Sequence, residues 1–257
     1  PWHEILCSDV AHVLLDEAGG PVRLSGAQLT RLPSDDGIIG TDELDRRITR
    51  RGPVHHSQPR IVTITQSTEN GRVWSAPAIK SFVDHAHDLG LLVHVDGARV
   101  ANAIASQQVS PIDAVGDADI VSVGGTKNGL LFGDAILVRR PEHFPGINFV
   151  QKQIGHLASK HRYVAAQFLA LLADDLWLQT AAHANAMART LAEGLEQHRL
   201  QRLVRSVDLV DQQHDLAGRR EGLPQLALAD IVADVVDPRV AQLAVAQAAD
   251  GVVFVKP

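Results

Sequence analysis

The sequence has little cysteine, few aromatic residues and no concentration of positive charge. Its 257 residues include one cysteine, Cys7, and 4% aromatic residues. One cysteine cannot form an internal disulfide or a cysteine-rich metal site, so the chain is typical of a reducing compartment and we expect it to be cytoplasmic. Lys and Arg number 24 against 30 Asp and Glu. Because these charges form no basic run, binding to nucleic acid or to an anionic membrane is not expected, and a small-molecule ligand is favoured.

Long hydrophobic runs are also missing. No uninterrupted apolar segment approaches the roughly 20 residues that cross a bilayer. The first residues, PWHE, have neither the charged-then-apolar order of a signal peptide nor a methionine, so we expect the chain to begin inside a gene. The length allows one large domain or two small ones, and 45% hydrophobic residues can supply a sizeable core.

Short runs rich in β-branched residues alternate with helix-like segments. The runs cover residues 61–65, 91–95, 120–123 and 135–138, and their composition predicts buried strands. Between the first two runs, Pro77 opens a helix-like segment that Gly90 ends just before the next strand. This alternation predicts an α/β fold with a mostly parallel sheet, covered by helices on both faces.

Local signals surround this alternation. Residues 34–37 (SDDG) have the composition of a turn, and Thr41 is expected to cap a helix with Asp42 and Glu43 in its first turn. Between about residues 151 and 199 the pattern changes to long helices. We expect one buried helical face, made by Tyr163, Phe168, Leu171 and Leu172. A turn is expected at Leu176, Trp177 and Leu178.

Charged residues directly follow two of the predicted strands. The segment HVDGAR (94–99) contains Asp96 and Arg99, and GGTKNG (124–129) contains Lys127. The carboxyl ends of parallel strands border the ligand crevice of such sheets, so we expect these three side chains to converge there. Each charge alone would more often be a solvated loop residue, and only the three together favour a site.

The chemistry of Lys127 is narrowed by its neighbours. Asn128 follows it, so the phosphate-binding P-loop pattern is absent, and the three-glycine dinucleotide pattern is absent too. The remaining chemical role for Lys127 is to form an imine with an aldehyde. The lysine amine must then be partly desolvated, and a nearby carboxylate must keep the heteroaromatic ring of the aldehyde protonated. Asp96 fits that carboxylate role.

In this order and spacing, the two motifs resemble the low-specificity L-threonine aldolases, which are pyridoxal-phosphate enzymes of the aspartate-aminotransferase fold type I. The likeness extends over residues 1 to about 198, through the segments SDVAH (8–12), QSTENG (66–71), KHRYVAAQ (160–167) and DDLWL (174–178). It implies a large-domain core over residues 1–198, incomplete at its N-terminus, and a divergent or incomplete segment over residues 199–257. It also implies a homo-oligomer, a dimer or homotetramer, in amino-acid metabolism.

The resemblance assigns roles to single residues. Lys127 would hold pyridoxal 5'-phosphate through an imine, with Thr126 beside it, and Asp96 would pair with the ring nitrogen. Arg99 would bind the substrate carboxylate, and His12 would stack on the cofactor ring. Two further assignments concern a histidine near the substrate hydroxyl, which is His55 or its neighbour His56, and a basic residue for the cofactor phosphate, which is Arg162 or Lys160.

The resemblance also predicts an activity. The chain would cleave the Cα–Cβ bond of L-threonine or L-allo-threonine to glycine and acetaldehyde, with His55, acting through water, as the base for the β-hydroxyl proton. Another pyridoxal-phosphate β-eliminating lyase and a non-catalytic remnant are the alternatives. Because no glycine-rich phosphate-binding turn precedes Pro1, and the arginines after residue 199 match no motif, we expect this chain to bind the cofactor weakly.

Several polar residues also have structural interpretations. His12 could be a core histidine, and Glu69 could shape its loop rather than take part in chemistry. His85 and His87 are two residues apart on a helix, so we expect both to be exposed. The 13 histidines show no spacing that indicates a zinc site, and no metal is expected.

Overall fold

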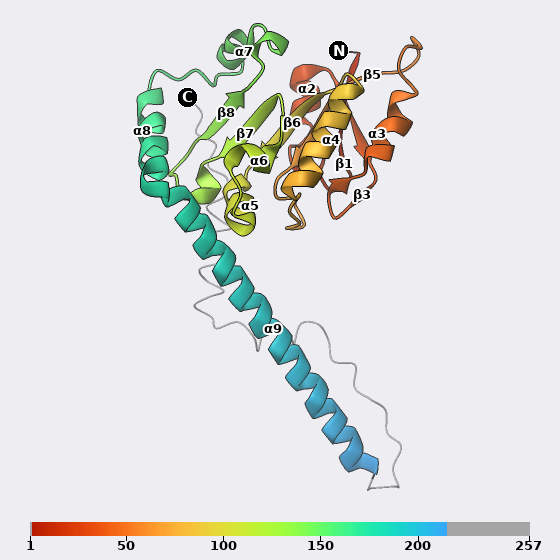
Figure 1. The fold of residues 1–257 in the computed structure, drawn as a ribbon, viewed down its shortest axis with the longest axis vertical. Coiled ribbons are helices and arrows are strands. Elements are labelled where there is room, and N and C mark those ends of the chain that lie inside the picture. Colours follow the sequence, from red (N-terminus) through yellow and green to blue (C-terminus); the bar gives the residue numbers. More distant parts are fainter. Residues whose placement is uncertain (1, 215–257) are drawn as a thin grey trace. The chain divides into compact units, whose positions relative to one another are not determined.

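The computed structural model describes residues 2–214, with side chains up to residue 199. The chain up to Leu191 belongs to one compact unit, built on a six-stranded sheet in the order β2-β1-β5-β6-β7-β8 (Figure 1). These strands are β1 (His3–Ser8), β2 (Gln28–Leu32), β5 (Gln58–Thr65), β6 (Leu92–Gly97), β7 (Ile120–Gly124) and β8 (Asp134–Val138). Neighbouring strands are parallel except β7 and β8, which are antiparallel. The predicted mostly parallel sheet and its four predicted strands are confirmed.

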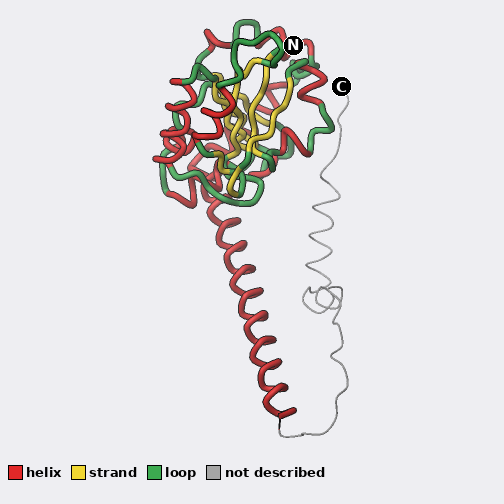
Figure 2. Tube along the Cα trace, turned by 90° about the vertical axis from the view of Figure 1, so that its right-hand side faces the viewer, coloured by secondary structure: helices red, strands yellow, loops and turns green. Residues whose placement is uncertain are grey.

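One face of this sheet carries the hydrophobic core. Successive side chains of a strand point to opposite faces, so the buried residues Leu6, Val62, Val93, Val95 and Val121 share one side. The helices packed into the same core are α3 (Thr41–Ile48), α4 (Ala76–Asp88), α5 (Val100–Gln107) and α6 (Pro111–Val115). The strands therefore lie at the centre of the unit, with helices and loops around them (Figure 2).

Helix α4 forms as its sequence predicts. Ser75 caps it by accepting a hydrogen bond from the Ala78 amide at 3.3 Å, and Pro77 lies in the first turn. Gly90 follows the C-terminus with a φ of 69°, a conformation that glycine adopts without steric cost. The apolar side of α4 buries Ile79 and Phe82 against the sheet, so local capping and tertiary packing favour the same helix.

The segment between β2 and β5 contains a small hairpin and α3. Strands β3 (Ser34–Asp35) and β4 (Ile38–Ile39) pair across Asp36 and Gly37, whose φ values are 51° and 87°. Positive φ at both central residues is what a tight hairpin turn requires, so the predicted turn is confirmed. The predicted cap of α3 was one residue late, because Gly40 is the N-cap and Thr41 already lies inside the helix.

The remaining elements are short, apart from those after β8. Two helices, α1 (His12–Leu15) and α2 (Gly20–Ser25), connect β1 to β2. The 3-10 turns are η1 (Thr126–Asn128), η2 (Pro141–His143) and η3 (Ala173–Asp175). The last helices are α7 (Ile147–Gln153), α8 (His161–Leu172) and α9 (Leu176–His214), and residues of α9 from Ala192 onward belong to a second unit. Within residues 2–214, none of the helices is long and apolar enough to span a membrane.

The structure corrects the predictions for the helical segment after β8. Of the apolar residues predicted for the buried face of α8, Leu171 is buried, but Tyr163 and Leu172 are more than half exposed. The turn that follows is η3, where Asp174 has a φ of 51°, and Leu176 already starts α9. Helical periodicity marked an apolar stripe here, but the described part of the chain supplies no surface that covers it.

Strand β8 is also less covered than predicted. Ile136 and Leu137 point to opposite faces of the sheet, yet their side chains are 55% and 51% exposed. The expected cover of helices on both faces therefore does not extend to this edge of the sheet. Of the predicted divergent segment 199–257, residues 215–257 lie outside the part of the chain that the structure describes.

Candidate active site

Two loops that carry the predicted site residues meet at the carboxyl ends of β6 and β7. In the sheet, Asp96 pairs with Ser122 and Gly97 with Val123. A Cβ atom on Gly97 would lie 2.5 Å from the Ser122 carbonyl oxygen, and one on Gly124 would lie 2.6 Å from the Ala98 carbonyl oxygen. Contacts that short leave room only for glycine, so the motif glycines allow the backbones of the two loops to pack directly together.

Asp96 presents one carboxylate oxygen for a ligand. Its Oδ1 accepts a hydrogen bond from the Ala98 amide at 3.0 Å, and within residues 2–199 its other oxygen has no protein donor. The side chain is half-buried and lies on the same sheet face as Thr65, its partner in β5. A fixed carboxylate with one oxygen available can accept a hydrogen bond from a protonated ring nitrogen.

Lys127 lies in η1, directly after β7, and Arg99 is the N-cap of α5, directly after β6. The structure thus brings the backbones of Asp96, Arg99 and Lys127 to one edge of the sheet. Thr126, Lys127 and Arg99 are all exposed. The partial desolvation that an imine-forming amine requires is therefore not provided by the described residues of this chain, and a bound ligand would have to contribute it.

The lysine turn is anchored by the start of α9. The Asn128 side chain donates to the Trp177 carbonyl at 2.9 Å and accepts from the Thr180 hydroxyl at 3.0 Å. A second amide pair joins α5 to α9, where Asn102 donates to Asn185 at 3.0 Å and the Asn185 amide donates to the Asn102 carbonyl at 2.9 Å. Sequence reasoning missed this role of α9, because the contacts join residues 49 to 83 positions apart.

His12 lies at the same edge, at the start of α1 after β1. Its backbone amide donates to Glu69 Oε1 at 2.8 Å, and its Nδ1 atom is 3.0 Å from Glu17 Oε1. The imidazole is 42% exposed, so His12 is not the core histidine of the alternative interpretation. Glu69 lies four residues after the carboxyl end of β5 and was interpreted from sequence only as a loop residue.

His94 is a further residue that sequence reasoning did not single out for the site. It lies in β6 on the same face as Asp96, and its Nδ1 atom is 2.8 Å from the Thr63 hydroxyl oxygen. Burial lowers the pKa of His94, while the charge of Asp96 opposes that shift. A neutral imidazole beneath Asp96 leaves the carboxylate charge available to a ligand rather than to an internal ion pair.

The structure does not bring His55 to this edge. His55 and His56 lie in the loop before β5, at the end of the sheet opposite to α5 (Figure 1). The eight residues of β5 span roughly 26 Å at 3.3 Å per residue. Within one chain, the predicted contact of His55 with a substrate beside Asp96 therefore has no geometric support, and the same holds for His56.

Arg162 and Lys160 lie at the start of α8. The Arg162 guanidinium stacks over the neighbouring Tyr163 ring at 4.8 Å, and both basic side chains are exposed. Among the described residues, Arg162 forms no hydrogen bond or ion pair with the Asp96 or Lys127 loops. Its predicted contact with a cofactor phosphate stays a prediction.

The prediction that His85 and His87 are exposed was wrong. Both are partly buried, because they approach carboxylates from neighbouring segments. His85 Nε2 is 2.9 Å from Asp45 Oδ1, and His87 Nε2 is 2.9 Å from Asp119 Oδ2. The two-residue spacing of the histidines on α4 correctly indicated that they do not bind one ligand together. It could not show that each histidine contacts a carboxylate from another segment.

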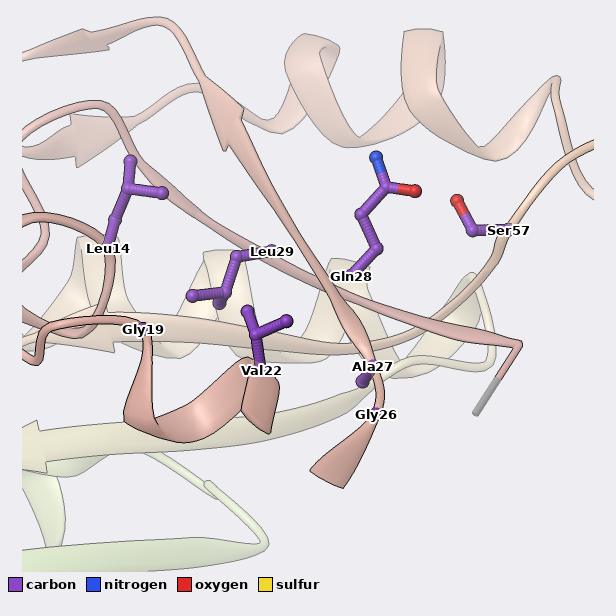
Figure 3. Close-up of a pocket in the computed structure, with 8 residues that line it drawn as sticks. All are labelled: Leu14, Gly19, Val22, Gly26, Ala27, Gln28, Leu29 and Ser57. Atoms are coloured by element: carbon purple, nitrogen blue, oxygen red, sulfur yellow. The ribbon is translucent and has the colours of Figure 1, made fainter. Parts of the chain in front are cut away.

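A shallow hollow of about 530 Å³ lies elsewhere, beside the edge strand β2 (Figure 3). It is lined by Leu14, Gly19, Val22, Gly26, Ala27, Gln28, Leu29 and Ser57. These residues include no charged or titratable side chain, so the hollow supplies no acid, no base and no imine-forming amine. The candidate site is therefore the pair of loops after β6 and β7 rather than this hollow.

Comparisons with family models and with known proteins agree on one family for this chain. The family model described as beta-eliminating lyase matches residues 1–215. A low-specificity L-threonine aldolase of Pseudomonas aeruginosa is 39% identical over 195 residues, which are 75% of this chain and 56% of that protein. An alanine racemase of Cochliobolus carbonum, TOXG, is 27% identical over 197 residues, which are 74% of this chain and 50% of that protein.

A solved structure agrees with this family. Threonine aldolase of Leishmania major superposes with a TM-score of 0.72 at 27% identity, covering 77% of this chain and 58% of that one. The chain thus spans a little over half the length of these aldolases.

Proposed function

Because this chain belongs to the beta-eliminating lyase family, we propose that it carries the lysine and carboxylate machinery of a pyridoxal-phosphate enzyme that cleaves L-threonine or L-allo-threonine to glycine and acetaldehyde. The observation that supports this most is the backbone packing of the Asp96 loop against the Lys127 loop. This packing supports the proposal because it brings together the backbones of a residue with a carboxylate and a residue with an amine, two groups that the cofactor needs.

The residues of this edge fit the cofactor. Asp96 has one oxygen bound to the Ala98 amide and one available for the N–H of a heteroaromatic ring. Glu69 Oε2 is buried without a hydrogen-bond partner among the described residues, which leaves an acceptor for a ligand donor. Gly124 allows the Lys127 loop to pack directly against the Asp96 loop, because a Cβ atom there would lie 2.6 Å from the Ala98 carbonyl oxygen. When bound, pyridoxal phosphate would stabilise negative charge that develops at the substrate α-carbon.

The chain's own residues then have defined tasks. The Lys127 amine would hold the aldehyde of the cofactor, with Thr126 beside it. Asp96 would keep the proton on the ring nitrogen, which makes the ring a better acceptor of charge. Arg99, at the same edge, would bind the substrate carboxylate through its planar guanidinium, and His12 would cover one face of the ring.

Two parts of the proposal concern groups beyond this edge. Arg162 is proposed to reach the cofactor phosphate. A base for the β-hydroxyl proton is also needed, and His55 could serve only from a second copy of the chain, because its loop lies at the opposite end of its own sheet. We therefore propose a homo-oligomer. The buried free thiol of Cys7 is consistent with our further proposal of a cytoplasmic protein.

Lysine labelling tests the proposal. The full chain is incubated with pyridoxal phosphate, reduced with borohydride and mapped by mass spectrometry, and we expect the pyridoxyl group on Lys127. Lys127→Arg should abolish the label, whereas Lys152→Arg, at an exposed lysine of α7, should leave it unchanged. A label that survives in Lys127→Arg would contradict the assignment.

Product analysis separates the candidate reactions. Acetaldehyde and glycine from L-threonine, without ammonia, support the aldolase, whereas ammonia release supports a β-eliminating lyase. Since a relative is named an alanine racemase, conversion of L-alanine to D-alanine is the second candidate activity and is assayed alongside. A chain that neither takes up cofactor nor turns over these substrates would be the non-catalytic remnant.

A further inference from the structure

The Glu69 carboxylate joins two segments of the site edge, the residue at the start of α1 and the end of β5. Its Oε1 atom accepts the backbone amide of His12 at 2.8 Å and the hydroxyl of Thr65 at 2.9 Å. Thr65 ends β5 and pairs in register with Asp96 of β6, whereas His12 follows β1. The carboxylate therefore ties the segment after β1 to the residue that lies beside Asp96.

The second oxygen of Glu69 is unusual. Oε2 is shielded from solvent and has no hydrogen-bond partner among residues 2–199. A buried carboxylate oxygen without a donor is costly, because it loses water without replacing it. A residue that served only to shape a loop would be expected to use both oxygens or to leave one in water.

Few other contacts of the α1 side chains hold His12 in place. Residues 12–15 form a helix of four residues in which no side chain is buried, so core packing contributes little to its placement. The imidazole itself contacts Glu17, which is about half exposed. The preceding residue, Ala11, is buried and its amide donates to the Ser8 carbonyl of β1 at 3.2 Å, and the hydrogen bond from the His12 amide to Glu69 adds a side-chain contact from the loop after β5.

We propose that Glu69 is a positioning residue of the ligand site, which acts by fixing His12 at the sheet edge that also carries Asp96. The ligand in this inference rests on the proposed function, since His12 is there assigned to one face of the cofactor ring. Glu69 forms hydrogen bonds with His12 and Thr65, and none with Lys127 or Asp96 among residues 2–199, so it would act through the backbone of His12.

A double-mutant cycle tests the coupling. Cofactor affinity is measured by absorbance titration with pyridoxal phosphate in the full chain, its Glu69→Ala and His12→Ala variants, and the double variant. We expect each single variant to bind roughly tenfold more weakly, and the double variant to bind no more weakly than either single one. Glu69→Gln keeps one acceptor oxygen for the His12 amide and should therefore bind the cofactor more tightly than Glu69→Ala.

The control is Asn70→Ala, which removes an exposed neighbour whose contact is with Asp36. It should bind cofactor as the parent chain does. Additive losses in the cycle would mean that Glu69 acts independently of His12 and would overturn the proposal. Weakened binding in Asn70→Ala equal to that of Glu69→Ala would also overturn it, because any change of this loop would then have the same effect.

A second readout does not need the cofactor. Hydrogen exchange of the His12 amide, measured by NMR, should be at least roughly tenfold faster in Glu69→Ala than in the parent chain, and restored in Glu69→Gln. If the parent chain binds no cofactor, the proposed function fails, and this exchange rate alone decides the positioning role. Equal exchange in Glu69→Ala and the parent chain would overturn it.

Discussion

At the scale of single residues, Cys7 illustrates how position in the sheet controls reactivity. The thiol lies in β1 with no exposed surface, and its Sγ atom is 3.7 Å from the Thr30 carbonyl oxygen. Burial raises the pKa of Cys7 to about 11, with a further contribution from the charge of Glu69. The thiolate is the reactive form, so this cysteine is held in a state that is inert to alkylation and oxidation.

We therefore expect Cys7 of the folded chain to react with iodoacetamide at pH 8 at least about 100-fold more slowly than a free cysteine. Unfolding in guanidinium chloride should restore the ordinary rate, which serves as the internal control because the chain has no other cysteine. The adduct is quantified by mass spectrometry. Rapid labelling of the folded chain would mean that β1 opens on the timescale of the reaction.

At the scale of elements, the start of α9 holds the lysine turn in place. The Asn128 side chain forms two hydrogen bonds, with the Trp177 carbonyl and the Thr180 hydroxyl. Such bonds add to stability only when they replace hydrogen bonds to water at little cost, which requires that both partners are held in place. The neighbouring pair of Asn102 and Asn185 has the same chemistry but contacts α5 instead of η1. The two pairs therefore allow a matched comparison of stability and ligand binding.

Asn128→Ala should lower the free energy of unfolding by about 1–2 kcal/mol, because two hydrogen bonds are lost. It should also weaken pyridoxal-phosphate binding, since η1 carries Lys127. Asn185→Ala is expected to cost about the same stability and leave the cofactor affinity unchanged. Urea unfolding and absorbance titration measure the two quantities. Equal loss of affinity in both variants would show that the anchor of η1 has no specific role.

At the scale of the whole unit, a buried carboxylate network closes the end of the sheet opposite to the candidate site. Asp119 has no exposed surface and accepts hydrogen bonds from the Val93 amide, His87, Arg140 and His143. Burial by itself would raise the pKa of Asp119, but these four donors outweigh it and hold the pKa below its ordinary value. The ionised form is therefore favoured by folding.

The sign of the pH dependence follows from this shift. The unfolded chain takes up a proton at Asp119 at a higher pH than the folded chain, so the stabilisation is complete above about pH 5 and is lost as the pH falls through about 4 and then through the lower folded pKa. Asp119→Asn should lower the free energy of unfolding by about 3 kcal/mol at pH 7, with a smaller difference at pH 3.

Urea unfolding at pH 3 to 7 measures this difference. The matched control is Asp117→Asn, which removes an about half-exposed partner of Arg139 and Arg140 and should cost about 1 kcal/mol or less. A difference between Asp119→Asn and the parent chain that does not change between pH 7 and pH 3 would contradict the linkage.

Much of this unit is determined by local sequence. The β-branched runs around residues 61–65 and 120–123, the Pro77 and Gly90 boundaries of α4 and the SDDG turn all predicted the observed elements. The ends of β6 and β7 likewise predicted which residues share the site edge. These features depend on side-chain periodicity and backbone preference within a few residues, and parallel strands align their carboxyl ends whatever the details of packing.

Tertiary structure alone decided the rest. The buried Glu4 is paired with Arg47, 43 residues away, and Glu69 is joined to His12 across 57 residues. His55 lies at the amino end of β5, opposite to the end that carries the site, and its position before a predicted parallel strand already indicated this. Strand register and chain path determine which distant groups meet, and a buried polar group finds its partner only when both are fixed.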